Sequence, residues 1–252
     1  MIRLHREHVR APATWRQRVS QALPNAATYY REARGFEQFD VNSPCRRSGF
    51  TLFAPQVLRK RRGKPHFPAV WRAAKEALAI MSHGKCAYCE GEINAARSGQ
   101  VDHFQPKSLF PSLAYDWDNY FLACGGCNGA KGDKWPDDGA YLRPDREDPS
   151  TKLCFTVDGM VKAVGAATDA DQTIQDFDLK REWLVRRRKK QIELMLGRLR
   201  DAVDAYHAKK DFGRRLARSE VQRLKDPANA YSAALTQCFL REWKSACPGV
   251  RL

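Results

Sequence analysis

The stretch that decides the fold is residues 86–131, which contain Cys86-Ala-Tyr-Cys89, Asp102-His103 and Cys124-Gly-Gly-Cys127-Asn128-Gly-Ala-Lys131. The cysteines of each pair are separated by two residues, and this spacing lets one turn present two sulfurs to a single ion. Two such pairs make a closed tetrahedral set that suits Zn2+. The sequence therefore predicts a structural zinc site made by Cys86, Cys89, Cys124 and Cys127.

The polar residues of the same stretch predict a second site with different chemistry. A four-cysteine zinc site has no use for Asp102, His103 and Asn128 beside it. Carboxylate and amide oxygens suit Mg2+, Mn2+ or Ca2+, and they compete poorly with thiolates for zinc. We therefore expect two metals, sorted by the softness of their ligands.

Together these strings resemble the HNH endonucleases of the ββα-metal fold, whose pattern is paired CxxC, DH, a central Asn and CN..K. The pattern appears as VDHFQPKS around His103, YDWDNYFLAC around Asn119 and CGGCNGAKG around Asn128 and Lys131. Asn128 fills the third position of the family name in place of a histidine. This variation keeps an oxygen or nitrogen ligand for the metal.

The resemblance implies a role for each motif residue. His103 would be the general base that deprotonates the attacking water, since an unperturbed histidine has a pKa of about 6.5. Asp102 and Asn128 would hold one Mg2+ or Mn2+ against the scissile phosphate. Asn119 would fix the loop between two strands. Lys131 lies three residues after Asn128, on the same face of a helix, and could reach a phosphate.

The same stretch predicts two strands and a helix. Gln100 to Phe104 is typical of a short strand, Asn119 to Ala123 of the returning strand, and a short helix ending before Pro136 then carries the last motif residues. Such a unit is too small to bury a core, so it needs zinc or flanking elements to fold.

We expect those flanking elements to complete one composite α+β body, with the ββα-metal core embedded in mainly helical N- and C-terminal segments. A length of 252 residues suits such a body. The predicted segments are 1–66, of helices and loops; 67–141, the nuclease core with its zinc knuckles; and 142–252, a hairpin and helical region packed on the core.

Hydrophobic spacing predicts further elements outside the core. Apolar residues in Phe67 to Ser82 recur at helical intervals and lead into the first knuckle. Alternation in Leu153 to Val164 predicts a hairpin that turns at Asp158-Gly159. A long amphipathic helix is expected around Ile192 to Tyr206, packed in the core of the chain itself. A last helix is expected at about Ala230 to Trp243.

The segment after the core resembles one HNH subgroup, the nuclease subunits of Septu-type and retron-linked antiphage systems. The CAYCE string at Cys86 and the DHF-x-PKS string from Asp102 are typical of this subgroup, whose later motifs appear here as Arg143-Pro144-Asp145, Asp158-Gly159 and Thr173-Ile174 with Phe177 and Leu179. The resemblance covers about residues 70–200. It implies an ATPase partner of the ABC/OLD-like, PtuA-like kind.

Charge favours a polyanionic partner. The chain has 44 Lys and Arg against 29 Asp and Glu, a net charge of +15, which attracts nucleic acid in a salt-dependent way. The candidate contacts are two clusters and one lysine of the PKS string: Arg59, Lys60, Arg61, Arg62 and Lys64; Arg186, Arg187, Arg188, Lys189 and Lys190; and Lys107. For each cluster the alternative interpretation is a solvated face.

Cysteine usage and hydropathy indicate the compartment. Four cysteines lack CxxC partners and are expected to be reduced thiols: Cys45, Cys154, Cys238 and Cys247. No apolar run approaches the roughly 18 residues that span a bilayer, and the N-terminus lacks the apolar stretch of a signal peptide. We therefore expect a cytoplasmic protein with no membrane contact, where thiols stay reduced.

Three functions remain open. The first is a metal-dependent endonuclease that cuts DNA, as an effector of prokaryotic antiphage defence working with an ATPase. The second is a non-catalytic, zinc-stabilised module that binds nucleic acid, which has no reason to keep Asp102, His103, Asn119 and Asn128 together. The third is an HNH toxin that cleaves RNA such as transfer RNA. The sequence does not separate it from the first, because water attack on a phosphate needs no 2′ hydroxyl.

Overall fold

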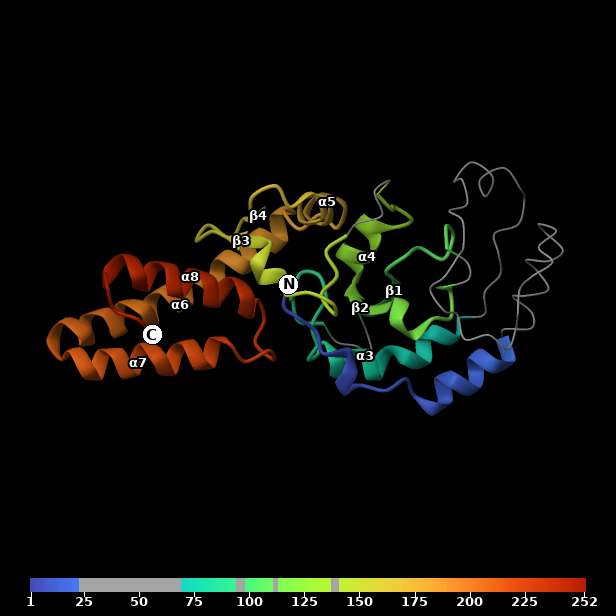
Figure 1. Ribbon diagram of the computed structural model, residues 1–252, viewed down its shortest axis with the longest axis horizontal. Coiled ribbons are helices and arrows are strands. Elements are labelled where there is room, and N and C mark those ends of the chain that lie inside the picture. Colours follow the sequence, from blue (N-terminus) through green and yellow to red (C-terminus); the bar gives the residue numbers. More distant parts are fainter. Residues whose placement is uncertain (23–68, 94–97, 111–112, 137–140) are drawn as a thin grey trace.

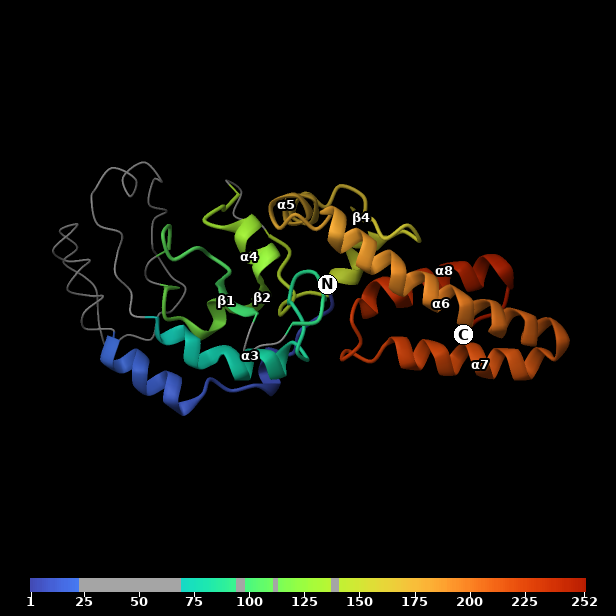
Figure 2. The ribbon, with the colours of Figure 1, turned by 180° about the vertical axis from the view of Figure 1, so that it is seen from behind.

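The computed structural model describes residues 1–22, 69–93, 98–110, 113–136 and 141–252. These residues form an elongated molecule (Figure 1), with a small two-stranded sheet and its helices near the middle and three long helices extending to one end. Seen from behind (Figure 2), the longest helix, α6 (Glu182–Ala208), runs obliquely in front of α8 (Ser232–Ala246), while α7 (Lys210–Leu224) lies below it.

The motif residues lie on a strand-strand-helix unit. β1 (Gly99–His103) pairs antiparallel with β2 (Tyr120–Cys124), and Asp102 lies opposite Phe121. α4 (Gly125–Lys131) follows β2 directly, because Cys124 caps the helix by accepting a hydrogen bond from the Cys127 backbone N–H. The predicted α+β class with a ββα core is therefore confirmed.

A helix covers the sheet on the side away from α4 (Figure 1). It begins as a 3-10 turn, η2 (Val70–Ala74), and continues as α3 (Lys75–Met81). Its buried side chains, Ala74, Leu78 and Met81, belong to the same core as β2. The predicted helix over 67–82 is thus present in its described part, with a tighter first turn than expected.

The N-terminal residues add a second layer beside α3. After the short turn η1 (Arg6–His8), residues 13–22 are helical. Trp15 of this helix packs against Trp117, at 5.7 Å between ring centroids, and against Tyr120 at 5.9 Å. Trp117 begins the 3-10 turn η4 (Trp117–Asn119), which leads into β2. The N-terminal segment therefore supports the strand that carries Cys124.

The predicted hairpin is confirmed in β3 (Leu153–Phe155) and β4 (Val161–Ala163), which follow the 3-10 turn η5 (Pro149–Thr151) and precede α5 (Thr168–Asp176). Gly159 at its turn has a φ of +85°, and a Cβ there would lie 2.5 Å from the Val185 carbonyl oxygen of α6. Only glycine both adopts this positive φ readily and leaves room for the Val185 carbonyl, so the turn packs directly against α6.

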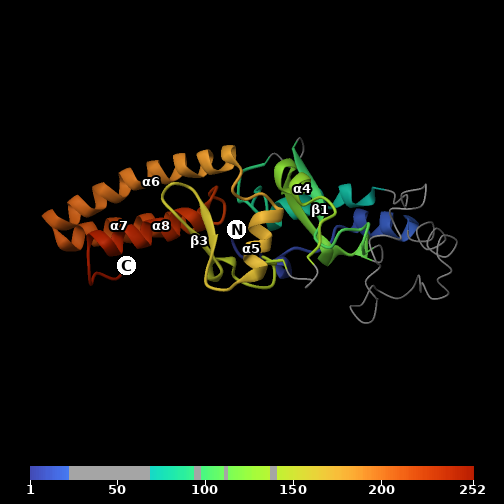
Figure 3. The same ribbon diagram turned by 90° about the horizontal axis from the view of Figure 1, so that it is seen from above.

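The helical lobe consists of α6, α7 (Lys210–Leu224) and α8 (Ser232–Ala246), and the view from above (Figure 3) shows α6 running along the other two. Ile192, Met195 and Leu199 of α6 are buried within the chain, as predicted. One cluster of buried side chains joins this lobe to the ββα unit. Among the described residues, no helix is long and apolar enough to cross a membrane.

Helix α7 was not expected from the sequence. Its buried residues are Gly213, Ala217, Val221 and Leu224, so few large apolar side chains mark its buried face. A Cβ at Gly213 would lie 2.1 Å from the Tyr206 backbone nitrogen of α6. Small residues are therefore the means by which α7 approaches α6, and the same residues weaken the hydrophobic signal.

Candidate functional site

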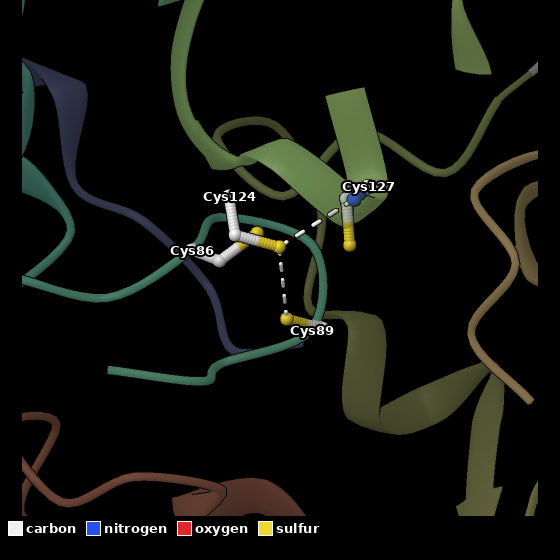
Figure 4. Close-up of side chains that lie close together, drawn as sticks. All are labelled: Cys86, Cys89, Cys124 and Cys127. Carbon is white, nitrogen blue, oxygen red and sulfur yellow. Dashed lines mark hydrogen bonds between the residues drawn. The ribbon is translucent and has the colours of Figure 1, made fainter. Parts of the chain in front are cut away.

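The structure brings the four predicted zinc ligands together (Figure 4). The first knuckle follows α3 and lies against β2, because the Ala87 N–H donates to the Leu122 carbonyl at 2.9 Å. The other two sulfurs come from the end of β2 and the first turn of α4. All four sulfurs lie within 4.8 Å of one another, and we call this set the sulfur cluster: Cys86, Cys89, Cys124 and Cys127.

The geometry of the sulfur cluster fits zinc. Tetrahedral Zn2+ with bonds of about 2.3 Å places its sulfurs about 3.8 Å apart. The sulfurs of Cys89 and Cys124 are 3.8 Å apart. Hydrogen bonds from Cys127, Cys86 and Cys89 lower the pKa of the Cys124 thiol, whereas burial raises the pKa of Cys86 and the hydrogen bond with Cys124 raises that of Cys127. The sulfur cluster could therefore hold a structural zinc ion.

An arginine outside the motif contacts the sulfur cluster. Arg181, at the start of α6, places Nη2 3.3 Å from the Cys127 sulfur and 3.6 Å from that of Cys124. Its Nη1 donates to the Asp178 carbonyl at 2.8 Å. A Cβ at Gly126 would lie 3.1 Å from Arg181, so the glycine of the second knuckle leaves room for the guanidinium. No motif in the sequence indicates this contact.

His103 is held in one orientation. Its Nε2 lies 3.0 Å from the Ala114 carbonyl oxygen. The rings of Trp71 and Tyr120 pack edge-on against it, at centroid distances of 4.9 and 5.1 Å. Because a carbonyl only accepts, Nε2 carries the proton and Nδ1 presents a lone pair.

Burial keeps the His103 ring neutral. Desolvation lowers its pKa to about 3, and the charge of Lys107 adds to this lowering. Lys107 lies over the Trp71 ring at 5.0 Å and is itself half-buried, which lowers its own pKa. A neutral imidazole with a free lone pair is the form that accepts a proton. Lys107 is the predicted basic residue that the structure brings to this histidine.

Asn119 fastens the loop between the strands. Its Oδ1 accepts from the Gln105 N–H at 2.8 Å, and its Nδ2 donates to the carbonyls of Gln105 at 3.0 Å and Leu113 at 3.1 Å. The last of these is one residue from Ala114, whose carbonyl holds His103. The side chain of Asn119 thus fixes the segment that orients the imidazole.

The environment of Asp102 corrects the expectation for Lys131. The Lys131 ammonium is 1% exposed and donates to Asp102 Oδ1 at 2.9 Å and to the His103 carbonyl at 2.6 Å. Tyr88 of the first knuckle donates its hydroxyl to Asp102 Oδ2. The Lys131 side chain thus points into the core toward the carboxylate, and the predicted phosphate contact would require it to leave Asp102.

Asn128 faces β1 from α4 without touching Asp102. Its Nδ2 donates to Gln100 Oε1 at 2.6 Å, and the side chain is half-exposed. The donor chemistry fits a hard divalent ion, and the Lys131 ammonium shows that positive charge is held against Asp102. An ion bound there would take the place of this ammonium. We call Asp102, His103, Asn128 and Lys131 the Asp102 centre.

The five basic residues predicted as one cluster on α6 point in different directions, because they lie on successive positions of a helix. Arg186 pairs with Glu182 and Lys189 with Glu193, while Arg187 and Lys190 are exposed. Arg188 is wrongly predicted as a nucleic-acid contact: it is 1% exposed and donates to the Gly159 carbonyl at 2.6 Å. A helix points every fourth residue inward, and Arg188 follows Leu184 on that face.

The other predicted basic cluster, Arg59, Lys60, Arg61, Arg62 and Lys64, lies outside the described residues, as does Cys45.

A buried carboxylate behind β2 was also not assigned a role. Asp145 accepts from Arg6 Nε at 2.7 Å and from Arg143 Nε at 2.7 Å. Arg6 also donates to the carbonyls of Trp117 and Tyr120, at 3.0 and 2.7 Å. Burial raises the pKa of Asp145, but the hydrogen bonds from the two arginines lower it below its usual value. The Arg143-Pro144-Asp145 string could have pointed to this carboxylate, because it is one of the subgroup motifs, whereas Arg6 belongs to no motif.

Comparisons with known proteins agree with the site. Residues 86–134 match the family model described as HNH endonuclease. Two curated proteins named Septu protein PtuB are similar to the chain. The one from Bacillus thuringiensis is 34% identical over 92 residues, which is 36% of this chain and 33% of that protein. The one from Bacillus mycoides (strain KBAB4) is 26% identical over 148 residues, 47% of this chain and 50% of that protein.

These matches confirm the resemblance to HNH endonucleases and to PtuB-like Septu proteins. The chain contains an HNH endonuclease domain, and HNH nucleases depend on metal ions. The chain spans between a third and a half of the length of the two curated relatives. No solved structure matches it.

Proposed function

We propose that this chain is a metal-dependent endonuclease that hydrolyses the phosphodiester bonds of DNA, with His103 as its general base. The observation that carries the proposal is the orientation of the imidazole, whose Nε2 is fixed by the Ala114 carbonyl while Nδ1 keeps its lone pair. A non-catalytic binding module would not need a buried histidine held in this tautomer.

The residues around His103 support a hydrolytic step. Nδ1 accepts the proton of the attacking water, and Asn119 keeps the loop that orients the ring. Lys107, beside the ring, offers a positive charge to the scissile phosphate. Asn119 acts through the loop and is a positioning residue.

The sulfur and oxygen ligands would bind different metal ions. Zn2+ would be structural, on the sulfur cluster, and Mg2+ or Mn2+ would be held by the oxygens of Asp102 and Asn128. Such an ion supplies positive charge that stabilises the transition state and the leaving 3′ oxygen. The Lys131 ammonium, which pairs with Asp102 in the structure, would leave the carboxylate to make room for the ion.

The biological setting belongs to the same proposal. The similarity to two proteins named Septu protein PtuB supports a role as an effector of prokaryotic antiphage defence. We propose that the chain works in the cytoplasm with an ATPase partner, as the sequence resemblance implies. Copurification of the two coexpressed proteins, followed by cleavage assays with and without ATP, tests this part separately.

The central test is cleavage of supercoiled plasmid by the zinc-loaded chain with Mg2+, with Mn2+ and without either ion. His103→Ala should reduce nicking by about 10²–10⁴-fold, the usual contribution of a general base. His207→Ala is the matched control, because it removes an exposed histidine from α6. Equal activity of His103→Ala and wild type would exclude His103 as the base.

The same assay separates the other functions. If wild type cuts no plasmid with either ion, the assay is repeated with the ATPase partner and with transfer RNA. Cleavage of transfer RNA alone would identify an RNase in place of a DNase. Binding of nucleic acid without cleavage under every condition would identify a non-catalytic zinc module.

A further inference from the structure

A cavity of about 430 Å³ lies in the helical lobe, where α6 faces the end of α7 and the start of α8. Four cationic side chains line it, Arg187, Lys190, Arg198 and Arg223, and Glu92 is the carboxylate among its lining residues. Its size falls within the roughly 300–1,000 Å³ typical of ligand sites. The cavity therefore combines a ligand-sized space with an excess of positive charge.

Only two of the five basic residues 186–190 of α6 line this cavity. Arg186 and Lys189 point elsewhere and pair with glutamates of the same helix, and Arg188 is buried. Arg187 and Lys190 line the cavity. Of the residues that the structure describes, no carboxylate lies at ion-pairing distance from either of these two. Arg187 lies over the Trp183 ring, 5.5 Å from its centroid, so within the described part of the chain its charge has an aromatic partner but no carboxylate to neutralise it.

The two remaining arginines are held in place by a shared carboxylate. Glu220 of α7 lies 3.5 Å from Arg198 Nη1 and also pairs with Arg223. One carboxylate between two guanidiniums fixes both and leaves a net positive charge. Arg187 and Arg198 are eleven residues apart on one helix, so the cations extend over about 16 Å. That length exceeds what a single small anion would contact.

The cavity also has an aromatic wall. Tyr231, which precedes α8, is buried and has a φ of +59°, a backbone conformation that a tyrosine rarely adopts. Its N–H donates to the Glu90 carbonyl at 3.2 Å, which ties it to the first zinc knuckle. Because Tyr231 is 5% exposed, it shapes the wall and offers no face to a base. The match to a nucleic-acid strand is therefore with its phosphates, which the cations along α6 can contact.

We propose that this cavity binds the sugar-phosphate backbone of a nucleic-acid strand, as a contact separate from the Asp102 centre. Arg187 and Lys190 bind successive phosphates and position the polymer without reading its sequence. The inference rests on the proposed function, because it takes the polymer to be the nuclease substrate. An acidic segment of a partner protein is the competing occupant.

The test compares two pairs of substitutions within one string of α6. Arg187→Gln with Lys190→Gln removes two charges from the cavity, and Arg186→Gln with Lys189→Gln removes two charges outside it. Binding of a fluorescein-labelled 30-mer, single-stranded or duplex, is measured by anisotropy with zinc-loaded full-length protein and no added divalent metal. Circular dichroism and zinc content confirm that each variant is folded.

The cavity pair should weaken binding at least tenfold at 0.1 M salt and lower the slope of log K against log[salt] by about 2. The control pair should change affinity less than threefold. Equal losses in both pairs would indicate a diffuse electrostatic field, and no loss in either would remove the cavity from nucleic-acid binding. Both results would overturn the proposal.

Two further probes identify the occupant. Polyglutamate that binds wild type, but not the cavity pair, while DNA binding is unchanged would assign the cavity to an acidic protein segment. A mononucleotide that binds as tightly as the 30-mer would make it a small-ligand site. Either result overturns the strand assignment. Because binding is measured without metal, it should persist in His103→Ala, so failure of the nuclease proposal is distinguishable from failure of this one.

Discussion

The sulfur cluster and the Asp102 centre share one ββα unit, but their donor atoms are arranged differently. The four sulfurs converge within 4.8 Å, with a spacing that suits one tetrahedral ion. The oxygen donors do not converge: Asp102 accepts from Tyr88 and Lys131, and Asn128 donates to Gln100. The four sulfurs are already placed to bind one ion, whereas the negative charge of Asp102 is paired with the ammonium of Lys131.

This difference agrees with the proposed roles, which are structural for the sulfur cluster and catalytic for the Asp102 centre. A structural ion needs a closed set of ligands, while a catalytic site must exchange its contents with solvent and substrate. The buried ion pair of Lys131 with Asp102 places an ammonium where the proposed function places a metal ion. Tyr88 connects the two centres, because it lies between two cysteines of the cluster and donates to Asp102.

The largest expected effect follows from loss of the structural zinc. Cys89→Ser should bind zinc poorly and lose the cooperative unfolding of the ββα unit, since structural zinc sites contribute about 10–16 kcal/mol of apparent binding energy. Zinc content and thermal unfolding measure this. Cys154→Ser, outside the cluster, should retain zinc. Full zinc occupancy and wild-type unfolding in Cys89→Ser would show that the sulfur cluster is not a structural zinc site.

The second expected effect concerns the buried ion pair. Lys131→Met should lower the free energy of unfolding by about 3–5 kcal/mol, because Asp102 is left buried and uncompensated. Adding Asp102→Asn removes that charge and should restore at least half of the loss. Urea denaturation of the single and double variants measures the coupling. Strictly additive losses would show that the pair is not coupled.

The third expected effect concerns the arginine on the sulfur cluster. Arg181→Gln should weaken zinc binding by about 10–100-fold, as loss of a hydrogen bond to a metal ligand usually does. Transfer of zinc to a colorimetric chelator measures this. Arg187→Gln is the control, because Arg187 also packs on Trp183 but is not among the partners of the sulfurs. Identical zinc transfer from both variants would contradict the role of Arg181.

The smallest expected effect sharpens the boundary between the centres. Tyr88→Phe should cost about 1.5 kcal/mol of stability, because one Asp102 oxygen loses its buried donor. Zinc affinity should stay unchanged, since the ring still fills its place against Phe177. Chemical denaturation and zinc titration test the two statements. A weakened zinc site would mean that the centres are energetically coupled through Tyr88.

Local sequence was sufficient to predict the ββα unit, because its ligands, strands and turns follow one another within residues 86–131. It also predicted the hairpin at Gly159 and the apolar stripe of α6. Helix α7 was missed because it packs through small residues, and Arg188 was misplaced because charge alone does not indicate which helix face turns inward.

The sequence by itself determined the four cysteines, the motif order around His103 and the strong positive charge, since spacing and composition are local properties. The tertiary structure decided which partners each charge meets. It placed Lys131 against Asp102, Arg181 on the sulfurs, and Arg187 with Arg223 around one cavity. These pairs are distant in sequence, so their contacts depend on how helices and strands pack.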